Sequence, residues 1–202
     1  MVTTKVREIL ASDDTNIEKV SYLWGYYKWH TIMLVSLGVI GTYLFVSWLN
    51  RPETFFHVSV VSSEIYTEEE GELNNEINDL LETKGREEAY ATFNQPGQMI
   101  DRYFAQLTAG DHDIILMDDS AFENYGEPEM TQKFRIEEIS EENYLLSEET
   151  EHFIGIPSNL IPLFEDYWTT QDLILMIPQN TGRRETIIKF FETQGYTLEF
   201  ID

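Results

Sequence analysis

The segment that most constrains this chain is a run of 19 residues without a charge, from Thr31 to Leu49. In a helix that rises about 1.5 Å per residue the run is roughly 28 Å long, close to the hydrocarbon thickness of a bilayer. A single strand is excluded, because it would leave its backbone amides and carbonyls unpaired in lipid. Aromatic residues suited to the headgroup regions flank the run, namely Trp24, Tyr26, Tyr27, Trp29 and Trp48. The sequence therefore predicts a transmembrane helix over residues 31–49.

Two other interpretations compete with a membrane anchor. A cleaved signal peptide usually has an apolar region of about 7–15 residues followed by small residues at a cleavage site. This run is longer and ends in the sequence VSWL, which offers no such site. A buried core helix rarely lacks a polar stripe over so many residues. We therefore expect an uncleaved signal anchor that crosses the membrane once.

The basic residues around this run predict its orientation. Lys19 and Lys28 lie within about 20 residues of its N-terminal end, and Lys5 and Arg7 lie further out. On the C-terminal side Arg51 stands alone before an acidic stretch. The positive-inside rule then places the N-terminus in the cytoplasm and the C-terminal part of the chain outside the cell.

Residues 1–30 are expected to form a cytoplasmic or interfacial amphipathic segment. The stretch 15–29 has apolar residues at helical spacing, and Thr15 or Asn16 is suited to cap its start. Its apolar face consists of Ile17, Val20, Leu23, Trp24 and Tyr27. An anchor on the membrane surface is the favoured role, and a contact with a partner membrane protein is the alternative.

Charge separates the two sides of the predicted span. The chain has 13 basic and 37 acidic residues, and residues 1–50 hold four of each, so the whole net charge of -24 falls on residues 51–202. Nucleic acid is excluded as a partner, because phosphate binding needs a basic face. The absence of cysteine excludes disulfides, thiolate zinc sites and iron–sulfur clusters. A solvated, repulsive surface is the favoured role of the acidic residues, and docking of a cationic partner is the alternative.

Residues 52–202 are expected to form one acidic extracellular α/β domain. Strand patterns at 55–61, 88–93 and 113–117 alternate with helix patterns at 72–81, 98–107 and 119–125. This spacing is typical of βαβ units and predicts a mostly parallel sheet. Residues 127–150 break the rhythm. Further strands are expected at 152–156 and 173–177, a helix at 183–193, and a short edge strand at 196–201.

Two stretches resemble bacterial extracellular solute-binding proteins. In QLTAGDHDIILMDDSAFENYGE a helix ending in AGD leads into a DII strand, and DLILMIPQNTGRRETIIKFFETQG is similar to that family's late strand and following helix. The resemblance covers roughly residues 55–195 and implies one α/β lobe of a periplasmic binding protein, located outside the cell. The segment YYKWH before the span resembles leader regions of single-pass membrane proteins of Gram-positive bacteria. That family closes two lobes over a ligand and is usually lipidated through cysteine, so we transfer no ligand-binding residue from it.

Polar residues gather where the predicted strands end. The ligand-binding candidates are Ser62, Ser63, Asn94, Asp118, Asp119 and Ser120. Ligands of open α/β sheets bind beyond the carboxyl ends of the strands, so these residues predict a binding site at that edge. The favoured alternative is structural: Asp118 or Asp119 caps a helix, and Asn94 makes a turn.

The sequence carries no catalytic or metal-binding motif. The outer histidines, His57, His112 and His152, lack metal-ligand spacing, and a partly buried structural role is expected for them. His57 and His152 are candidates for adjacent strands. No nucleophile elbow, dinucleotide fingerprint or phosphate loop occurs, so we expect no catalytic residue, no metal and no cofactor.

These observations predict a non-enzymatic, single-pass membrane protein whose α/β domain lies outside the cell. It is expected to act as an accessory or interaction component of an envelope or transport complex, with the lipid bilayer and a membrane or envelope protein as partners. The alternative is a small-molecule or peptide sensor that binds at the Asp118 edge. A third hypothesis is an extracellular hydrolase that uses carboxylates.

Overall fold

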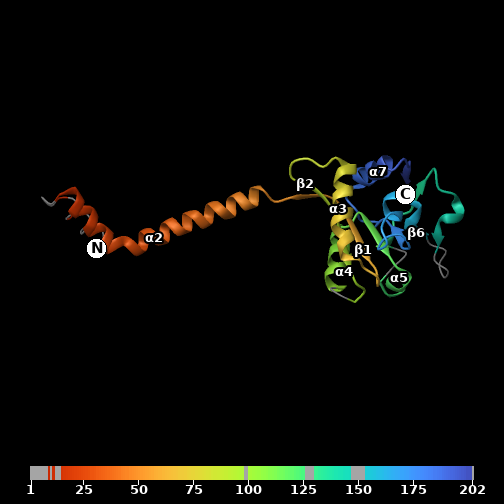
Figure 1. The fold of residues 1–202 in the computed structure, drawn as a ribbon, viewed down its shortest axis with the longest axis horizontal. Coiled ribbons are helices and arrows are strands. Elements are labelled where there is room, and N and C mark those ends of the chain that lie inside the picture. Colours follow the sequence, from red (N-terminus) through yellow and green to blue (C-terminus); the bar gives the residue numbers. More distant parts are fainter. Residues whose placement is uncertain are drawn as a thin grey trace. The chain divides into compact units, whose positions relative to one another are not determined.

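The computed structural model describes residues 9, 11, 15–97, 100–125, 130–146 and 153–201. The chain divides into two compact units, Met1–Arg51 and Pro52–Asp202, and each is described by itself (Figure 1). Three residues used above, Lys5, Arg7 and His152, lie outside the described residues, as does the start of the helix expected from residue 98.

The first unit is built on one helix, α2 (Asn16–Leu49), so the two predicted segments form a single continuous helix. At its start the Glu18 carboxylate accepts hydrogen bonds from the backbone N–H of Thr15 (3.0 Å) and from its hydroxyl (2.8 Å). These bonds lower the pKa of Glu18 and satisfy a donor that the first helical turn leaves open.

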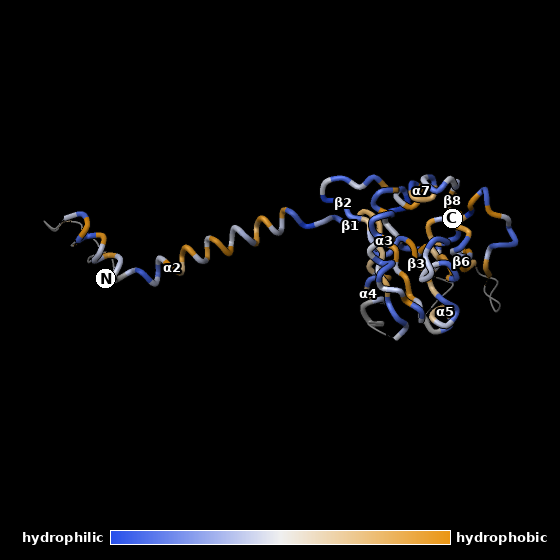
Figure 2. Tube along the Cα trace, viewed as in Figure 1, coloured by the Kyte–Doolittle hydropathy of each residue, from blue (hydrophilic) through white to orange (hydrophobic). Residues whose placement is uncertain are grey.

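The later part of α2 is long and apolar enough to cross a membrane. Tyr27–Leu49 spans 23 residues with a mean hydropathy of 2.0, and none of its apolar window is buried in the structure. Figure 2 shows this as the hydrophobic stretch along α2. Within the described residues it is the one helix with this property.

The second unit contains a six-stranded sheet with the order β2-β1-β3-β7-β6-β5. Its strands are β1 (Glu53–Val61), β2 (Glu87–Asn94), β3 (Ile114–Met117), β5 (Leu145–Leu146), β6 (Phe153–Pro157) and β7 (Ile174–Met176). The strands β2, β1 and β3 are parallel, as predicted, whereas β3–β7, β7–β6 and β6–β5 are antiparallel pairs.

The expectation of a mostly parallel sheet is therefore wrong, and the sheet is mixed. Parallel strands need a long crossover, usually a helix across one face, whereas antiparallel strands do not. Only the short helices η3 (Ser158–Leu160) and α6 (Pro162–Glu165) lie between β6 and β7. The chain therefore turns back on itself in this half of the sheet.

Helices cover both faces of the sheet and bury its apolar side chains. The helices are α3 (Thr67–Leu81), α4 (Ile100–Ala109), α5 (Asp119–Tyr125) and α7 (Arg184–Thr193). The larger core lies on the face with α3 and α7, where Phe56 stacks on Phe190 with ring centroids 4.9 Å apart. The smaller core includes Leu107 of α4 and Ala121 of α5. Alternation along β1 therefore directs His57 and Ser59 toward the face with α4 and α5.

Two asparagines of α3 cover the outer edge of the sheet. The backbone N–H of Ala89 in β2 donates to Asn78 Oδ1 at 3.0 Å, and the N–H of Ala91 donates to Asn74 Oδ1. Asn78 also donates to the carbonyl of Ala89. Polar backbone groups that an edge strand would otherwise present to solvent are thus satisfied within the domain.

The last strand does not extend the main sheet as expected. β8 (Leu198–Phe200) pairs antiparallel with β4 (Phe134–Ile136) in a separate two-stranded sheet. β4 lies in the stretch where the sequence shows no clear periodicity. Phe134, Ile136 and Leu198 are buried in the larger core, which explains why this small sheet is held against the domain.

Gly155 tests how closely β6 and β7 approach each other. A Cβ atom at this position would lie 2.0 Å from the carbonyl oxygen of Leu175. We expect Gly155→Ala to lower the free energy of unfolding by about 2 kcal/mol or more, because the strands must move apart. Urea unfolding of the full chain in detergent measures this.

The control for this variant is Gly71→Ala. Nothing lies within 4 Å of a Cβ at this exposed position of α3. Alanine there should raise the free energy of unfolding by up to about 1 kcal/mol, because it favours the helix. Equal stability of G155A and the wild type would contradict the close approach of the two strands.

Candidate functional site

The structure brings the predicted strand-edge residues to one end of the sheet. Ser62 and Ser63 follow β1, Asn94 ends β2, and Asp118, Asp119 and Ser120 follow β3. The backbone N–H of Ser62 donates to the carbonyl of Asn94 at 3.1 Å, and the N–H of Asp118 donates to the carbonyl of Val61 at 3.1 Å. The three parallel strands thus end side by side.

The contacts of Asp118 are those of a helix cap. Its Oδ2 accepts hydrogen bonds from the backbone N–H (2.6 Å) and the hydroxyl (2.8 Å) of Ser63. Its Oδ1 accepts the backbone N–H of Ala121 in the first turn of α5 at 2.6 Å. Burial opposes ionisation, but the bonds from Ser63 and Ala121 outweigh it and lower the pKa of Asp118. Ligand binding by this carboxylate stays a prediction.

The neighbouring polar residues also make turn contacts. The hydroxyl of Ser62 donates to the carbonyl of Glu64 at 3.1 Å and accepts its N–H at 3.2 Å. Asn94 Nδ2 lies 3.4 Å from the carbonyl oxygen of Thr92. Asp119 and Ser120 are exposed. Among the described residues no group of three or more His, Asp or Glu side chains is placed to hold a metal ion.

A buried histidine pair lies further back along these strands, within β1 and just before β3, and the sequence did not predict it. His57 and His112 are each 1% exposed, and the centroids of their rings lie 4.6 Å apart. His57 Nδ1 is 3.1 Å from the carbonyl oxygen of Asp111, which only accepts, so this nitrogen carries the proton. His57 Nε2 lies 2.9 Å from the hydroxyl oxygen of Thr92.

The second histidine is held neutral. His112 Nδ1 lies 3.2 Å from the protonated Nδ1 of His57, so it accepts there and carries its own proton on Nε2. That Nε2 is buried and has no hydrogen-bond partner among the described residues. Burial, followed by the charges of His57 and Arg183, lowers the pKa of His112 to about 3. Tyr103 of α4 stacks on the same ring at 5.6 Å.

An ion pair completes this cluster. The Asp113 side chain is fully buried and accepts the Arg183 Nε–H at 2.8 Å. It also accepts the hydroxyl of Thr181 at 2.8 Å and the backbone N–H of His57 at 2.9 Å. Burial raises the pKa of Asp113, and the guanidinium of Arg183 opposes that rise. The cluster joins β1, the start of β3 and the start of α7, which is the structural role expected for the histidines.

The sequence suggested adjacent strands for His57 and His152, but the sheet order does not place β6 next to β1. His152 itself lies outside the described residues. The strand that follows it, β6, is separated from β1 by β3 and β7. The ring of His57 instead contacts His112, which comes just before the buried strand β3. No sequence pattern around His112 indicated this contact.

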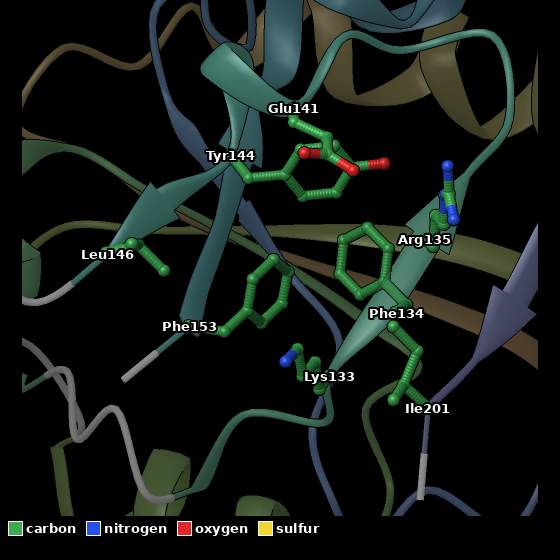
Figure 3. Close-up of a pocket in the computed structure, with 8 residues that line it drawn as sticks. All are labelled: Lys133, Phe134, Arg135, Glu141, Tyr144, Leu146, Phe153 and Ile201. Carbon is green, nitrogen blue, oxygen red and sulfur yellow. The ribbon is translucent and has the colours of Figure 1, made fainter. Parts of the chain in front are cut away.

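A cavity of ≈ 320 Å³ lies elsewhere, between the two sheets. Its wall contains the rings of Phe134 on β4, Phe153 on β6 and Tyr144, which follows the short helix η2 (Glu141–Asn143) (Figure 3). The other lining residues are the aliphatic Leu146 and Ile201 and the charged Lys133, Arg135 and Glu141. None of these residues was a candidate from the sequence, because they come from four separate segments.

Asp118 provides a test of the capping role. We expect Asp118→Ala to lower the free energy of unfolding at pH 7 by about 1–2 kcal/mol, because Ala121 and Ser63 lose their acceptor. The folded-state pKa is lowered, so this contribution is present above the ordinary value of 3.8 and is lost as the pH falls through the folded value. Urea unfolding at pH 7 and pH 3 measures both effects.

Asp119→Ala is the matched control, because it removes the same charge from an exposed neighbour. It should cost less than about 0.5 kcal/mol, which is the contribution of one carboxylate near a helix N-terminus. Equal losses in D118A and D119A would contradict the capping role of Asp118.

His112 predicts a pH dependence of folding. In the unfolded chain His112 takes up a proton below its ordinary pKa of 6.5, whereas in the folded chain it does so only near its lowered pKa of about 3. The free energy of unfolding therefore falls as the pH falls between these two values. Between pH 7 and pH 5 the wild type should lose about 2 kcal/mol that His112→Gln does not lose. His30→Gln, at an exposed position of α2, should keep the wild-type loss. A slope unchanged in H112Q would contradict the burial of a neutral ring.

No protein-family model matches this chain, and no curated protein or solved structure matches it. The resemblance to extracellular solute-binding proteins therefore stays a prediction. The features that bear on function are the apolar helix and the polar contacts of the mixed α/β domain.

Proposed function

We propose that this chain is a single-pass membrane protein whose acidic α/β domain acts outside the cell as a non-enzymatic interaction component of an envelope or transport complex. The observation that carries the proposal is the apolar stretch Tyr27–Leu49. None of its apolar window is buried by the rest of the chain. At about 25 cal/mol per Å² of apolar surface, exposing so long a stretch to water is costly, whereas a bilayer covers it.

The bases before this stretch support the orientation. Lys19 precedes the stretch, and Lys28 is an exposed residue at its N-terminal end. Residues 51–202 carry the whole net negative charge. A cytoplasmic N-terminus and an outer C-terminal domain follow from the positive-inside rule.

An interaction role is supported by two exposed aromatic side chains. Trp168 is 73% exposed and Tyr66 is 53% exposed. The backbone N–H groups of Trp168 and Thr169 donate to the Glu69 carboxylate at 3.1 and 2.9 Å, and the N–H of Tyr66 donates to the Thr169 hydroxyl at 3.0 Å. Two large rings are thus held on hydrogen-bonded segments, and such residues often carry the binding energy of protein interfaces.

A small-molecule sensor remains the second candidate. The strand edge gives it little support, because both oxygens of Asp118 already accept hydrogen bonds from Ser63 and Ala121. The cavity between the two sheets supports small-molecule binding at a different place, since its volume of ≈ 320 Å³ falls within the range of known ligand pockets.

Charges placed inside the apolar stretch test the anchor. We expect Val39→Arg combined with Ile40→Arg to release much of the full chain from the membrane fraction, because each arginine at a helix centre costs about 2.5–3.5 kcal/mol of insertion. The paired control, Val39→Leu with Ile40→Leu, should stay in the membrane after alkaline extraction. Retention of the arginine variant would contradict a transmembrane role for this stretch.

Protease added to intact cells tests the orientation. It should remove residues 52–202 and leave residues 1–30 protected, whereas an untouched outer domain would overturn the proposed topology.

Cross-linking followed by purification of the full chain tests the partner. Trp168→Ala should reduce capture of a membrane or envelope protein, and unchanged capture would exclude this aromatic surface as the interface.

A further inference from the structure

We propose that the cavity between the two sheets binds a small monocarboxylate with an apolar body. This site is distinct from the strand edge around Asp118 and does not depend on the anchor or on the partner proposed above. The cavity combines a rigid aromatic wall, a volume of ligand size and two basic side chains in a strongly acidic domain.

The aromatic wall is fixed before any ligand enters. Phe134 and Phe153 meet edge to face, with centroids 4.9 Å apart and planes at 85°. The Tyr144 hydroxyl accepts the backbone N–H of Ile136 at 2.7 Å and donates to its carbonyl at 3.1 Å. Both bonding directions of the phenol are used, so Tyr144 presents its ring to the cavity. Such preorganised walls lower the entropic cost of binding.

The volume sets the size of the apolar body. Taking about 30 Å³ for each water-sized group, ≈ 320 Å³ holds roughly ten non-hydrogen atoms. That is the size of a phenyl ring with a short carboxylate tail. Leu146 and Ile201, which are 56% and 39% exposed, leave apolar surface at the mouth for such a molecule to cover.

The charge at the rim selects an anion. Lys133 and Arg135 flank Phe134 on β4, and neither makes an ion pair among the described residues. The Ile201 N–H donates to the Lys133 carbonyl at 2.9 Å, which fixes the backbone from which this lysine extends. Residues 51–202 hold 9 bases against 33 acids, so two neighbouring bases beside one apolar cavity differ from the surrounding charge.

Two carboxylates limit that anion to a single charge. Glu141 lines the same cavity beside Tyr144 (Figure 3). Glu199 on β8 is the cross-strand neighbour of Arg135. A dianion would meet their repulsion, whereas one carboxylate placed toward Lys133 and Arg135 gains attraction from both. The site therefore fits a monocarboxylate better than a phosphate or a cation.

The test measures binding of three probes of similar size to the full chain in zwitterionic lipid nanodiscs. The probes are 3-phenylpropionate, its neutral amide and the cation 3-phenylpropylammonium, with empty nanodiscs as the blank for partitioning into lipid. We expect the carboxylate to bind with a dissociation constant on the order of 1 mM or tighter, about three- to tenfold more tightly than the amide. The cation should bind most weakly.

Variants locate the binding. Lys133→Gln and Arg135→Gln should each reduce the advantage of the carboxylate over the amide to about twofold or less, because each removes one attracting charge. Leu146→Glu should weaken binding of the carboxylate and of the amide, since it places a carboxylate in the apolar mouth. Lys84→Gln is the matched control, because it removes one exposed charge in the connection between α3 and β2 and should change nothing.

Several outcomes would overturn the proposal. These are equal affinity for the acid and the amide, an equal loss in K84Q and K133Q, or tighter binding of the cation. An absence of saturable binding up to about 10 mM would also overturn it, because a preformed pocket of this size should reach millimolar affinity. The thermal unfolding midpoint of each variant shows that a loss of binding is not a loss of folding.

Discussion

The second unit depends on one buried ion pair. Asp113 is fully enclosed, and an unpaired carboxylate there would be costly. Arg183 supplies the counter-charge from the start of α7, while Thr181 and the backbone of His57 supply hydrogen bonds. Removal of one partner from such a pair leaves a buried charge uncompensated, so the strands and the C-terminal helix are bound to the same set of contacts. The pair fixes relative position more than it adds stability.

Most acidic residues lie on the surface, away from the buried ion pair of Asp113 and Arg183. Within the described residues the ion pairs join Arg86 to Glu53 and Arg183 to Asp113, while most carboxylates face solvent. Stability therefore comes from apolar packing on both faces of the sheet. The surface charge acts on solubility and on the choice of partners. Lys133 and Arg135 at the cavity depart from this distribution, and their charge favours an anionic ligand there.

The sequence predicted those elements whose pattern repeats over several residues. The strands at 55–61, 88–93 and 113–117 and the helices after them are confirmed. The spacing of apolar residues and the turn residues between the elements made them predictable. The direction of β7 was not predictable from its apolar run, since a strand buried on both faces looks the same in either direction. β4 and β5 have three and two residues, too few for any period to show. The candidate residues after β1, β2 and β3 were predictable because parallel strands end together, whereas the cavity joins segments far apart in the chain.

The asparagines of α3 have a consequence for a protein held at high density on a surface. Neighbouring copies would present their sheet edges to one another, and an open edge is a template for lateral polymerisation. On the β2 side, Asn74 and Asn78 already occupy the amides of Ala89 and Ala91. A second chain would have to displace side chains that are part of the fold before it could add a strand. Edge-to-edge association of this domain is therefore opposed by two side-chain amides as well as by charge.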